Sequence, residues 1–182
     1  MKRTKSIIIL MVSISIVLSI SIGVILYNYY PTNYIKNCYD DDKKKFVDVV
    51  NVLRELYSEE FLSVYIDSDG NLNSQNRENN ANRVLPIDDR NKILFELYEE
   101  YKTDFPNIVF VKAYYDELGN IMVKFSLYVR KLIGKDNDSA DKIVYYLVYH
   151  DSEYQLDEYM KLADKDGLND NWFIYSEKGY VG

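Results

Sequence analysis

The chain has 182 residues, with 22 Lys and Arg against 29 Asp and Glu, and its formal net charge is −7. Such an acidic balance repels nucleic acid and anionic lipid, so we expect no nucleic-acid partner. The length that remains after the apolar N-terminal segment suits one folded domain with a single core.

The N-terminal segment contains an uncharged run, residues 7–26, which reads IIILMVSISIVLSISIGVIL. Twenty helical residues at about 1.5 Å each span about 30 Å, the thickness of the hydrocarbon core of a bilayer. Three basic residues precede the run, and the tyrosine-rich stretch YNYY follows it. Basic flanks stay in the cytoplasm, and tyrosines sit well at the headgroup layer. The sequence therefore predicts a cytoplasmic tail over 1–6, a single-pass transmembrane signal anchor over 7–27, and an extracytoplasmic remainder.

The rival interpretation of this segment is a cleaved signal peptide. Ser21, Ile22 and Gly23 form a small-x-small pattern that a signal peptidase accepts. Against cleavage, the apolar run continues through residues 24–26, where a polar stretch is expected before the cleavage site. We prefer the uncleaved anchor, and the sequence leaves open whether it is ever cleaved.

Three small residues recur along one face of the predicted anchor. Ser15, Ser19 and Gly23 are spaced by four residues, so a helix places them in one line. Small residues in this pattern let a second membrane helix approach closely, which predicts self-association through the anchor. The alternative is that serines are simply tolerated in a long apolar helix.

Residues 28–41 are polar and aromatic without a clear period, and we expect a stalk there. The single cysteine, Cys38, lies in this stretch, so the chain has no intrachain disulfide. Cys38 is either an incidental thiol or the site of a bridge between two anchored chains. Residues 27–182 hold all 29 acidic residues and 19 basic ones, because three of the 22 basic residues precede the anchor, so the charge of this part is near −10.

Residues 42–182 are predicted to form a small α+β domain, with an antiparallel sheet of four to five strands packed by two or three helices. Apolar spacing of three and four predicts a helix over 42–59 and a second helix that Asp88 or Asp89 caps and Pro106 ends. Alternation or continuous apolar character predicts strands over 61–67, 108–115, 121–130, 142–150 and 172–176. The Asn-rich run 71–83 is expected to be an exposed, poorly ordered loop. Residues 152–164 fit either a helix or a strand.

The clearest alternation in the chain covers residues 121–130. A strand of period two places Phe125 in the core and Tyr128 on the opposite face.

A weak candidate for a metal site follows the first strand. Asp67, Asp69 and Asn71 offer oxygen atoms at alternate positions, as calcium loops do. Counted from Asp67, the glycine is the fourth residue rather than the sixth, so the pattern does not fit an EF-hand. A turn built around Asp-Gly is the preferred interpretation, and we expect no metal or other cofactor.

The outer face of the sheet is the remaining candidate for a binding surface. Tyrosines that alternate with lysines and arginines suit a protein or glycan partner through aromatic and cationic contacts. The alternative is that these side chains only clothe an exposed sheet. The predicted face consists of Tyr65, Lys112, Tyr114, Lys124, Tyr128 and Arg130.

These observations favour a membrane-anchored extracytoplasmic module that binds a partner without catalysis. The alternatives are a hydrolase or transferase that uses carboxylates at the cell surface, and a small subunit of a membrane complex. The chain lacks a nucleophile elbow and a phosphate-binding Gly-rich loop, and its single histidine, His150, cannot build a multi-histidine zinc site. An enzyme is therefore the less favoured class.

Overall fold

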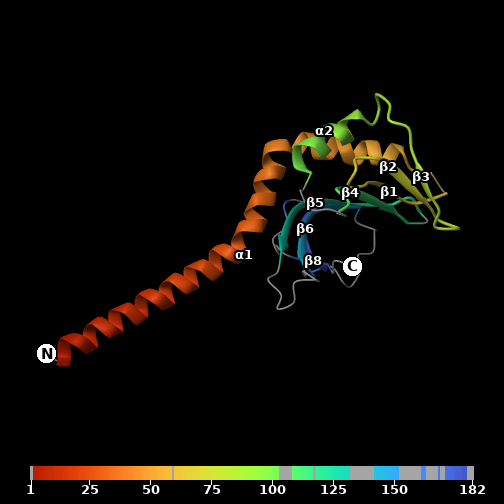
Figure 1. Cartoon of the computed structure of the whole chain (residues 1–182). Helices are drawn as coiled ribbons and strands as arrows, with labels where there is room; N and C mark the ends of the chain where they lie inside the picture. Colours follow the sequence, from red (N-terminus) through yellow and green to blue (C-terminus); the bar gives the residue numbers. More distant parts are fainter. Residues whose placement is uncertain are drawn as a thin grey trace.

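The computed structural model describes the backbone of residues 2–58, 60–102, 108–116, 118–131, 142–151, 161–162, 168 and 171–179. Within these, the side chains of 2–10, 24–28, 131, 161–162 and 179 are not described. The described part is an α+β fold in which helices cover one face of an antiparallel sheet (Figure 1). In chain order the elements are α1 (Lys2–Glu55), β1 (Phe61–Ile66), β2 (Leu72–Asn76), β3 (Asn82–Val84), α2 (Lys92–Tyr101), β4 (Val111–Tyr115), β5 (Ile121–Lys131), β6 (Lys142–His150), β7 (Lys161–Leu162) and β8 (Trp172–Gly179).

The sheet has eight strands within the described residues, in the order β3-β2-β1-β4-β5-β6-β8-β7, and each neighbouring pair is antiparallel. The α+β class and the antiparallel sheet are confirmed, but the predicted number of four to five strands is too low. Two of the additional strands, β2 and β3, come from the Asn-rich run. Strand β7 lies within 152–164, where a helix and a strand were both open, and the rest of that range lies outside the described residues.

The Asn-rich run forms a hairpin, so the prediction of a poorly ordered loop over 71–83 is wrong. Leu72 is fully buried and pairs with Ile66 of β1, which anchors β2 to the core. The asparagines shape the turn: Asn76 Oδ1 accepts hydrogen bonds from two backbone N–H groups, and Asn80 has a positive φ of 55°. Asparagine side chains bind nearby backbone and tolerate this conformation, so the composition encodes a turn here.

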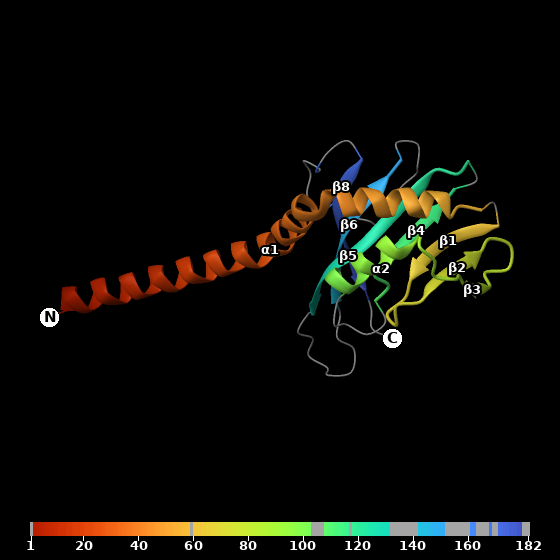
Figure 2. The ribbon, with the colours of Figure 1, turned by 90° about the horizontal axis from the view of Figure 1, so that it is seen from above.

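Helix α1 runs through the stretch that was expected to be a stalk. It continues past Pro31, and Ile35, Cys38 and Tyr39 are buried in the main core. Asp42 has non-helical backbone angles and marks a kink, after which the helix lies along the sheet (Figures 1 and 2). Residues 28–41 are therefore helical, and their C-terminal half belongs to the folded domain.

The main core lies between the helices and one face of the sheet. Phe46 of α1 is fully buried and contacts Phe125 of β5 and Trp172 of β8, with ring centroids 5.1 and 6.3 Å apart. Leu94 and Leu97 of α2 are also fully buried. This arrangement leaves the opposite face of the sheet uncovered by α1 and α2 (Figure 1).

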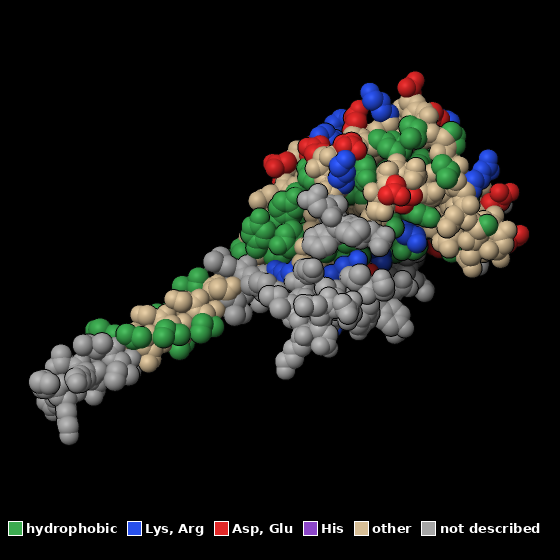
Figure 3. Space-filling view, in the orientation of Figure 1, with side chains coloured by type: hydrophobic (Ala, Val, Ile, Leu, Met, Phe, Trp, Pro, Cys, Tyr) green, Lys and Arg blue, Asp and Glu red, His purple; other side chains and the backbone are tan. Residues whose placement is uncertain are grey.

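The first part of α1 projects from the domain as an arm (Figures 1 and 2). Its apolar side chains over residues 11–23 are exposed, as the hydrophobic surface of the arm in Figure 3 shows. No helix in the described part of the chain is both long enough and apolar enough to cross a membrane.

Candidate functional site

A row of side chains crosses four neighbouring strands on the sheet face that α1 and α2 leave uncovered. Tyr65 of β1 pairs with Lys112 of β4, which pairs with Lys124 of β5, which in turn pairs with Val148 of β6. Directly opposed residues in antiparallel strands point to the same side, so the register alone brings two lysines together.

Tyrosine rings surround these two lysines. The amine of Lys112 lies 4.8 Å from the centroid of the Tyr114 ring, and the amine of Lys124 lies 5.4 Å from the same centroid. Lys112 also contacts the ring of Tyr65 at 5.5 Å, and Lys124 that of Tyr146 at 5.8 Å. Ring faces attract cations, which offsets part of the repulsion between the two ammonium groups.

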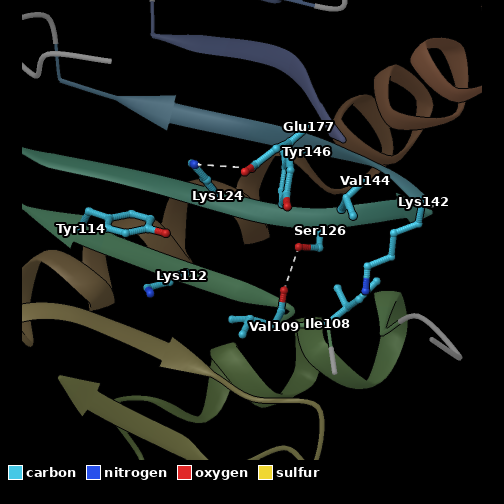
Figure 4. A pocket seen from close by; sticks show the side chains of 10 residues that line it. All are labelled: Ile108, Val109, Lys112, Tyr114, Lys124, Ser126, Lys142, Val144, Tyr146 and Glu177. Atoms are coloured by element: carbon cyan, nitrogen blue, oxygen red, sulfur yellow. Dashed lines mark hydrogen bonds and ion pairs between the residues drawn. The ribbon is translucent and has the colours of Figure 1, made fainter. Parts of the chain in front are cut away.

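The two lysines, Tyr114 and Tyr146 line a cavity of about 310 Å³, the lysine–tyrosine cavity (Figure 4). Its wall is completed by apolar residues and by Ser126, whose Oγ donates a 2.7 Å hydrogen bond to the carbonyl of Val109. The full lining is Ile108, Val109, Lys112, Tyr114, Lys124, Ser126, Lys142, Val144, Tyr146 and Glu177. The cavity thus combines cationic, aromatic and aliphatic surfaces.

The charge of the lysine–tyrosine cavity is opposite to that of the chain as a whole. Among the described residues, three lysines line the cavity and one carboxylate does, that of Glu177, which lies 4.0 Å from the amine of Lys124. Figure 4 shows the side chain of Lys142 extending from β6 toward Ile108, at the other end of the cavity from Lys112. The cavity is therefore a local cationic site on an acidic protein.

Burial and charge act together on one of these amines. Burial lowers the pKa of Lys112, and the nearby positive charge of Lys124 lowers it further. Burial raises the pKa of the Tyr146 hydroxyl, and the neighbouring Glu177 carboxylate adds to this effect. At neutral pH the cavity thus contains a neutral phenol beside Glu177 and an amine that loses its proton more easily than an ordinary lysine.

The structure brings together four of the six residues predicted for the binding face, and it places Tyr128 and Arg130 on the other side of the sheet. The cause is a β-bulge at Leu127: Ser126 pairs with Tyr146, and the next pair is Tyr128 with Tyr145. One extra residue reverses the alternation, so Tyr128 faces the helices together with Phe125. The expectation of opposite faces for these two rings is wrong.

After the bulge, both displaced residues contact aromatic rings on the helix side. Tyr128 packs against Tyr30 and Tyr34 of α1, with centroids 5.9 and 5.8 Å apart. Arg130 is buried, and its guanidinium lies 5.5 Å from the ring of Tyr145. The contacts of Tyr128 connect the arm-proximal part of α1 to the sheet.

The sequence interpretation missed four polar residues of the lysine–tyrosine cavity, namely Ser126, Lys142, Tyr146 and Glu177. Lys142 and Tyr146 lie on a strand that is apolar on both faces. They are each two residues from Val144, so the alternation of a strand places all three side chains on the same face, and this spacing was the signal in the sequence. Glu177 lies beyond the predicted end of the last strand, which continues to Gly179. The uncovered face thus extends over β6 and β8.

The three weak metal candidates belong to a hydrogen-bonded turn. Asp67 Oδ1 accepts from the N–H groups of Asp69 and Asn71, at 3.0 and 2.9 Å. Burial tends to raise the pKa of Asp67, but these hydrogen bonds outweigh it and the pKa is lowered. Gly70 has a φ of +83°, a conformation that glycine adopts without strain. The described residues contain no group of three or more His, Cys, Asp or Glu side chains arranged to hold a metal ion.

The three small residues predicted for helix pairing lie on the exposed arm. Ser15 and Ser19 line a shallow groove with four apolar neighbours, and Ser19 Oγ donates to the Ser15 carbonyl at 2.9 Å. A Cβ atom added to Gly23 would meet nothing within 4 Å. Pairing of two helices through these residues stays a prediction.

The carboxylates and the histidine do not form an acid–base centre in the described residues. The pKa is lowered at four described carboxyl groups, those of Asp42, Asp67, Asp88 and Asp116. His150 stacks on Phe173, while the Asp151 carboxylate binds Arg54, Tyr149 and the backbone N–H of Ile121. A general acid needs a raised carboxyl pKa, so this arrangement gives no support to carboxylate catalysis.

Comparison with protein-family models, with curated proteins and with solved structures finds no match to this chain.

Proposed function

We propose that this chain is a membrane-anchored, extracytoplasmic binding module whose lysine–tyrosine cavity binds a small organic carboxylate. The observation that carries the proposal is the placement of the Lys112 and Lys124 amines over one tyrosine ring, in a cavity whose described lining contains a single carboxylate. Two clustered ammonium groups repel each other, and a bound anion relieves that repulsion.

The walls of the cavity favour an organic acid over an inorganic anion. Ile108, Val109 and Val144 give apolar contacts, and Tyr114 and Tyr146 add ring surfaces. A volume of about 310 Å³ is at the small end of ligand sites, so a ligand of few heavy atoms fits it best. The carboxylate of such a ligand pairs with the lysines, and its carbon skeleton lies against the apolar wall.

The anchor part of the proposal rests on the sequence and on exposure. Residues 7–26 carry no charge and have a basic N-terminal flank, and the apolar side chains of residues 11–23 are exposed on the arm. A bilayer would cover this surface and hold the lysine–tyrosine cavity on the extracytoplasmic side.

The binding proposal is tested by calorimetric titration of the purified full-length chain with acetate, pyruvate and inorganic phosphate. We expect the two carboxylates to bind, and the variants Lys112→Gln and Lys124→Gln each to weaken pyruvate binding by about tenfold, the value of one lost charge contact of 1.4 kcal/mol. Lys44→Gln is the matched control, because Lys44 is an exposed lysine of α1 whose side chain is 88% accessible. Equal pyruvate affinity in all three variants, or no binding by the unmodified chain, would contradict the proposal.

A further inference from the structure

Lys112 has the environment of a nucleophilic amine. It lies in the lysine–tyrosine cavity, it pairs directly with Lys124 across β4 and β5, and its amine contacts two ring faces. No carboxylate within the described residues forms an ion pair with it, whereas Glu177 lies beside Lys124. Lysines activated by burial and by a neighbouring cation are the ones that attack carbonyl carbons.

We propose that Lys112 forms a reversible imine with the ketone of a 2-oxo acid, while Lys124 holds the carboxylate of the same molecule. This inference rests on the proposed function, because it assigns the class of organic acid that the cavity binds. In a 2-oxo acid the carboxylate and the ketone are adjacent carbons. The ketone and the carboxylate of one molecule therefore match the two amines, which both contact the ring of Tyr114.

The reaction needs no oxidant or reductant. The lone pair of the neutral Lys112 amine adds to the ketone carbon, and the electrons of the C=O double bond move to oxygen. A proton passes from nitrogen to that oxygen through solvent, which gives a carbinolamine. The hydroxyl takes up a proton from solvent, the C–O bond breaks as water leaves, and the nitrogen lone pair forms the C=N bond. The iminium nitrogen then returns one proton to solvent, which gives the imine. One water is released for each imine, and hydrolysis restores both partners.

The groups around Lys112 set the pH at which its amine is neutral. Lys124 on β5 faces it directly, Tyr65 on β1 and Tyr114 on β4 contact it through their rings, and Lys142, Tyr146 and Glu177 share the cavity. Burial and the charge of Lys124 both favour the neutral amine. Lys112 therefore reacts at a lower pH than an exposed lysine does.

The test is reductive trapping in the full-length chain. The protein is incubated with pyruvate and sodium borohydride, which reduces an imine to a stable secondary amine, and peptide mass spectrometry locates the adduct. We expect modification of Lys112 at least about tenfold faster than of Lys44, because the bound carboxylate raises the local concentration of the ketone. Modification of the lysines in proportion to their exposure, or preferential modification of Lys124 or Lys142, would overturn the proposal.

Two variants separate this inference from the binding proposal. Lys112→Arg keeps the positive charge but forms no imine, so it should retain pyruvate binding in calorimetry and lose the adduct, whereas Lys44→Arg should change neither.

Lys124→Gln should shift the pH profile of trapping at Lys112 to higher pH. Pyruvate that binds without any adduct at Lys112 refutes the imine alone, and absence of binding refutes the proposed function. The comparison of Lys112 with Lys44 in the unmodified chain depends on no variant.

Discussion

Tyr128 is a single residue that joins the arm-proximal part of α1 to the sheet. Its ring is partly buried and contacts the rings of Tyr30, Tyr34 and Tyr145. Aromatic pairs of this kind contribute about 0.5–1.5 kcal/mol each beyond the burial of area. The contacts therefore fix the direction in which α1 leaves the domain.

Removal of this ring should destabilise the fold without affecting the lysine–tyrosine cavity. We expect Tyr128→Ala to lower the free energy of unfolding by about 1–3 kcal/mol, and Phe125→Ala, at a fully buried position, by about 3–5 kcal/mol. Thermal melts of the full-length chain measure both. Tyr29→Ala, at a ring that is 61% exposed, is the control and should leave the melting temperature nearly unchanged. Weaker pyruvate binding by Tyr128→Ala would contradict its assignment to the helix side.

The position of Tyr128 also shows where residue-level prediction from the sequence ends. The alternation over residues 111–115 placed Lys112 correctly, and that over residues 121–126 placed Lys124 and Phe125 correctly, because a strand has only two faces. A β-bulge is set by pairing with the neighbouring strand, and the sequence of β5 alone contains no mark of it. Two of the six predicted face residues were therefore assigned to the wrong side.

At the scale of elements, the kink of α1 is held by a small charged network. The Lys45 amine lies 2.9 Å from Asp42 Oδ1 and 2.6 Å from Glu100 Oε2, and the Tyr101 hydroxyl donates to Asp42. Because Glu100 and Tyr101 belong to α2, the network connects the two helices at the kink. The hydrogen bond from Lys45, followed by that from Tyr101, lowers the pKa of Asp42.

This shift predicts how the stability depends on pH. The pKa of Asp42 is lower in the folded chain than in the unfolded chain, so its contribution is fully present above the unfolded pKa and is lost as the pH falls through the folded pKa. Asp42→Asn should lower the melting temperature at about pH 6, and the difference from the unmodified chain should disappear as acidification passes through the lowered pKa of Asp42. Asp41→Asn, at an exposed neighbouring carboxylate, should show little difference at either pH. If the melting temperature of Asp42→Asn stays below that of the unmodified chain in acid, the charged network is excluded as the cause of the difference.

Elements with apolar periodicity were predictable, and elements built from polar residues were not. The strands near 61–67, 121–130 and 142–150 follow from their patterns. The hairpin of β2 and β3 did not follow from the sequence pattern. Its asparagines bind the backbone locally, and composition alone does not distinguish such a turn from a disordered segment. In the expected stalk, Ile35, Cys38 and Tyr39 have helical spacing, but Pro31 precedes them, and a proline inside a chain segment favours the end of a helix.

At the scale of the whole molecule, the proposal places the arm in a bilayer and the sheet outside it. Leu18 is 56% exposed on the arm, and Leu118, in the turn between β4 and β5, is 85% exposed. The two leucines allow the same substitution to be compared at a proposed lipid-facing site and at a solvent-facing one.

Leu18→Arg should impair membrane insertion, at a cost of about 3 kcal/mol for a charge near the middle of a membrane helix. Leu118→Arg is the matched control and should leave insertion unchanged. Alkaline extraction of membrane fractions measures the integrated share of each chain. Recovery of the unmodified chain in the soluble fraction, or the same distribution for both variants, would contradict the anchor.

The continuity of α1 from Lys2 to its kink at Asp42 has a mechanical consequence. Each residue of an α-helix turns the chain by about 100°, so the number of residues between Gly23 and the buried Ile35 sets the rotational phase of the arm relative to the sheet. The backbone between Gly23 and Ile35 is helical throughout. If two chains pair through Ser15, Ser19 and Gly23, the orientation of their two lysine–tyrosine cavities relative to each other is fixed. Insertion of one residue after Gly23 then rotates each cavity about the helix axis by about 100°.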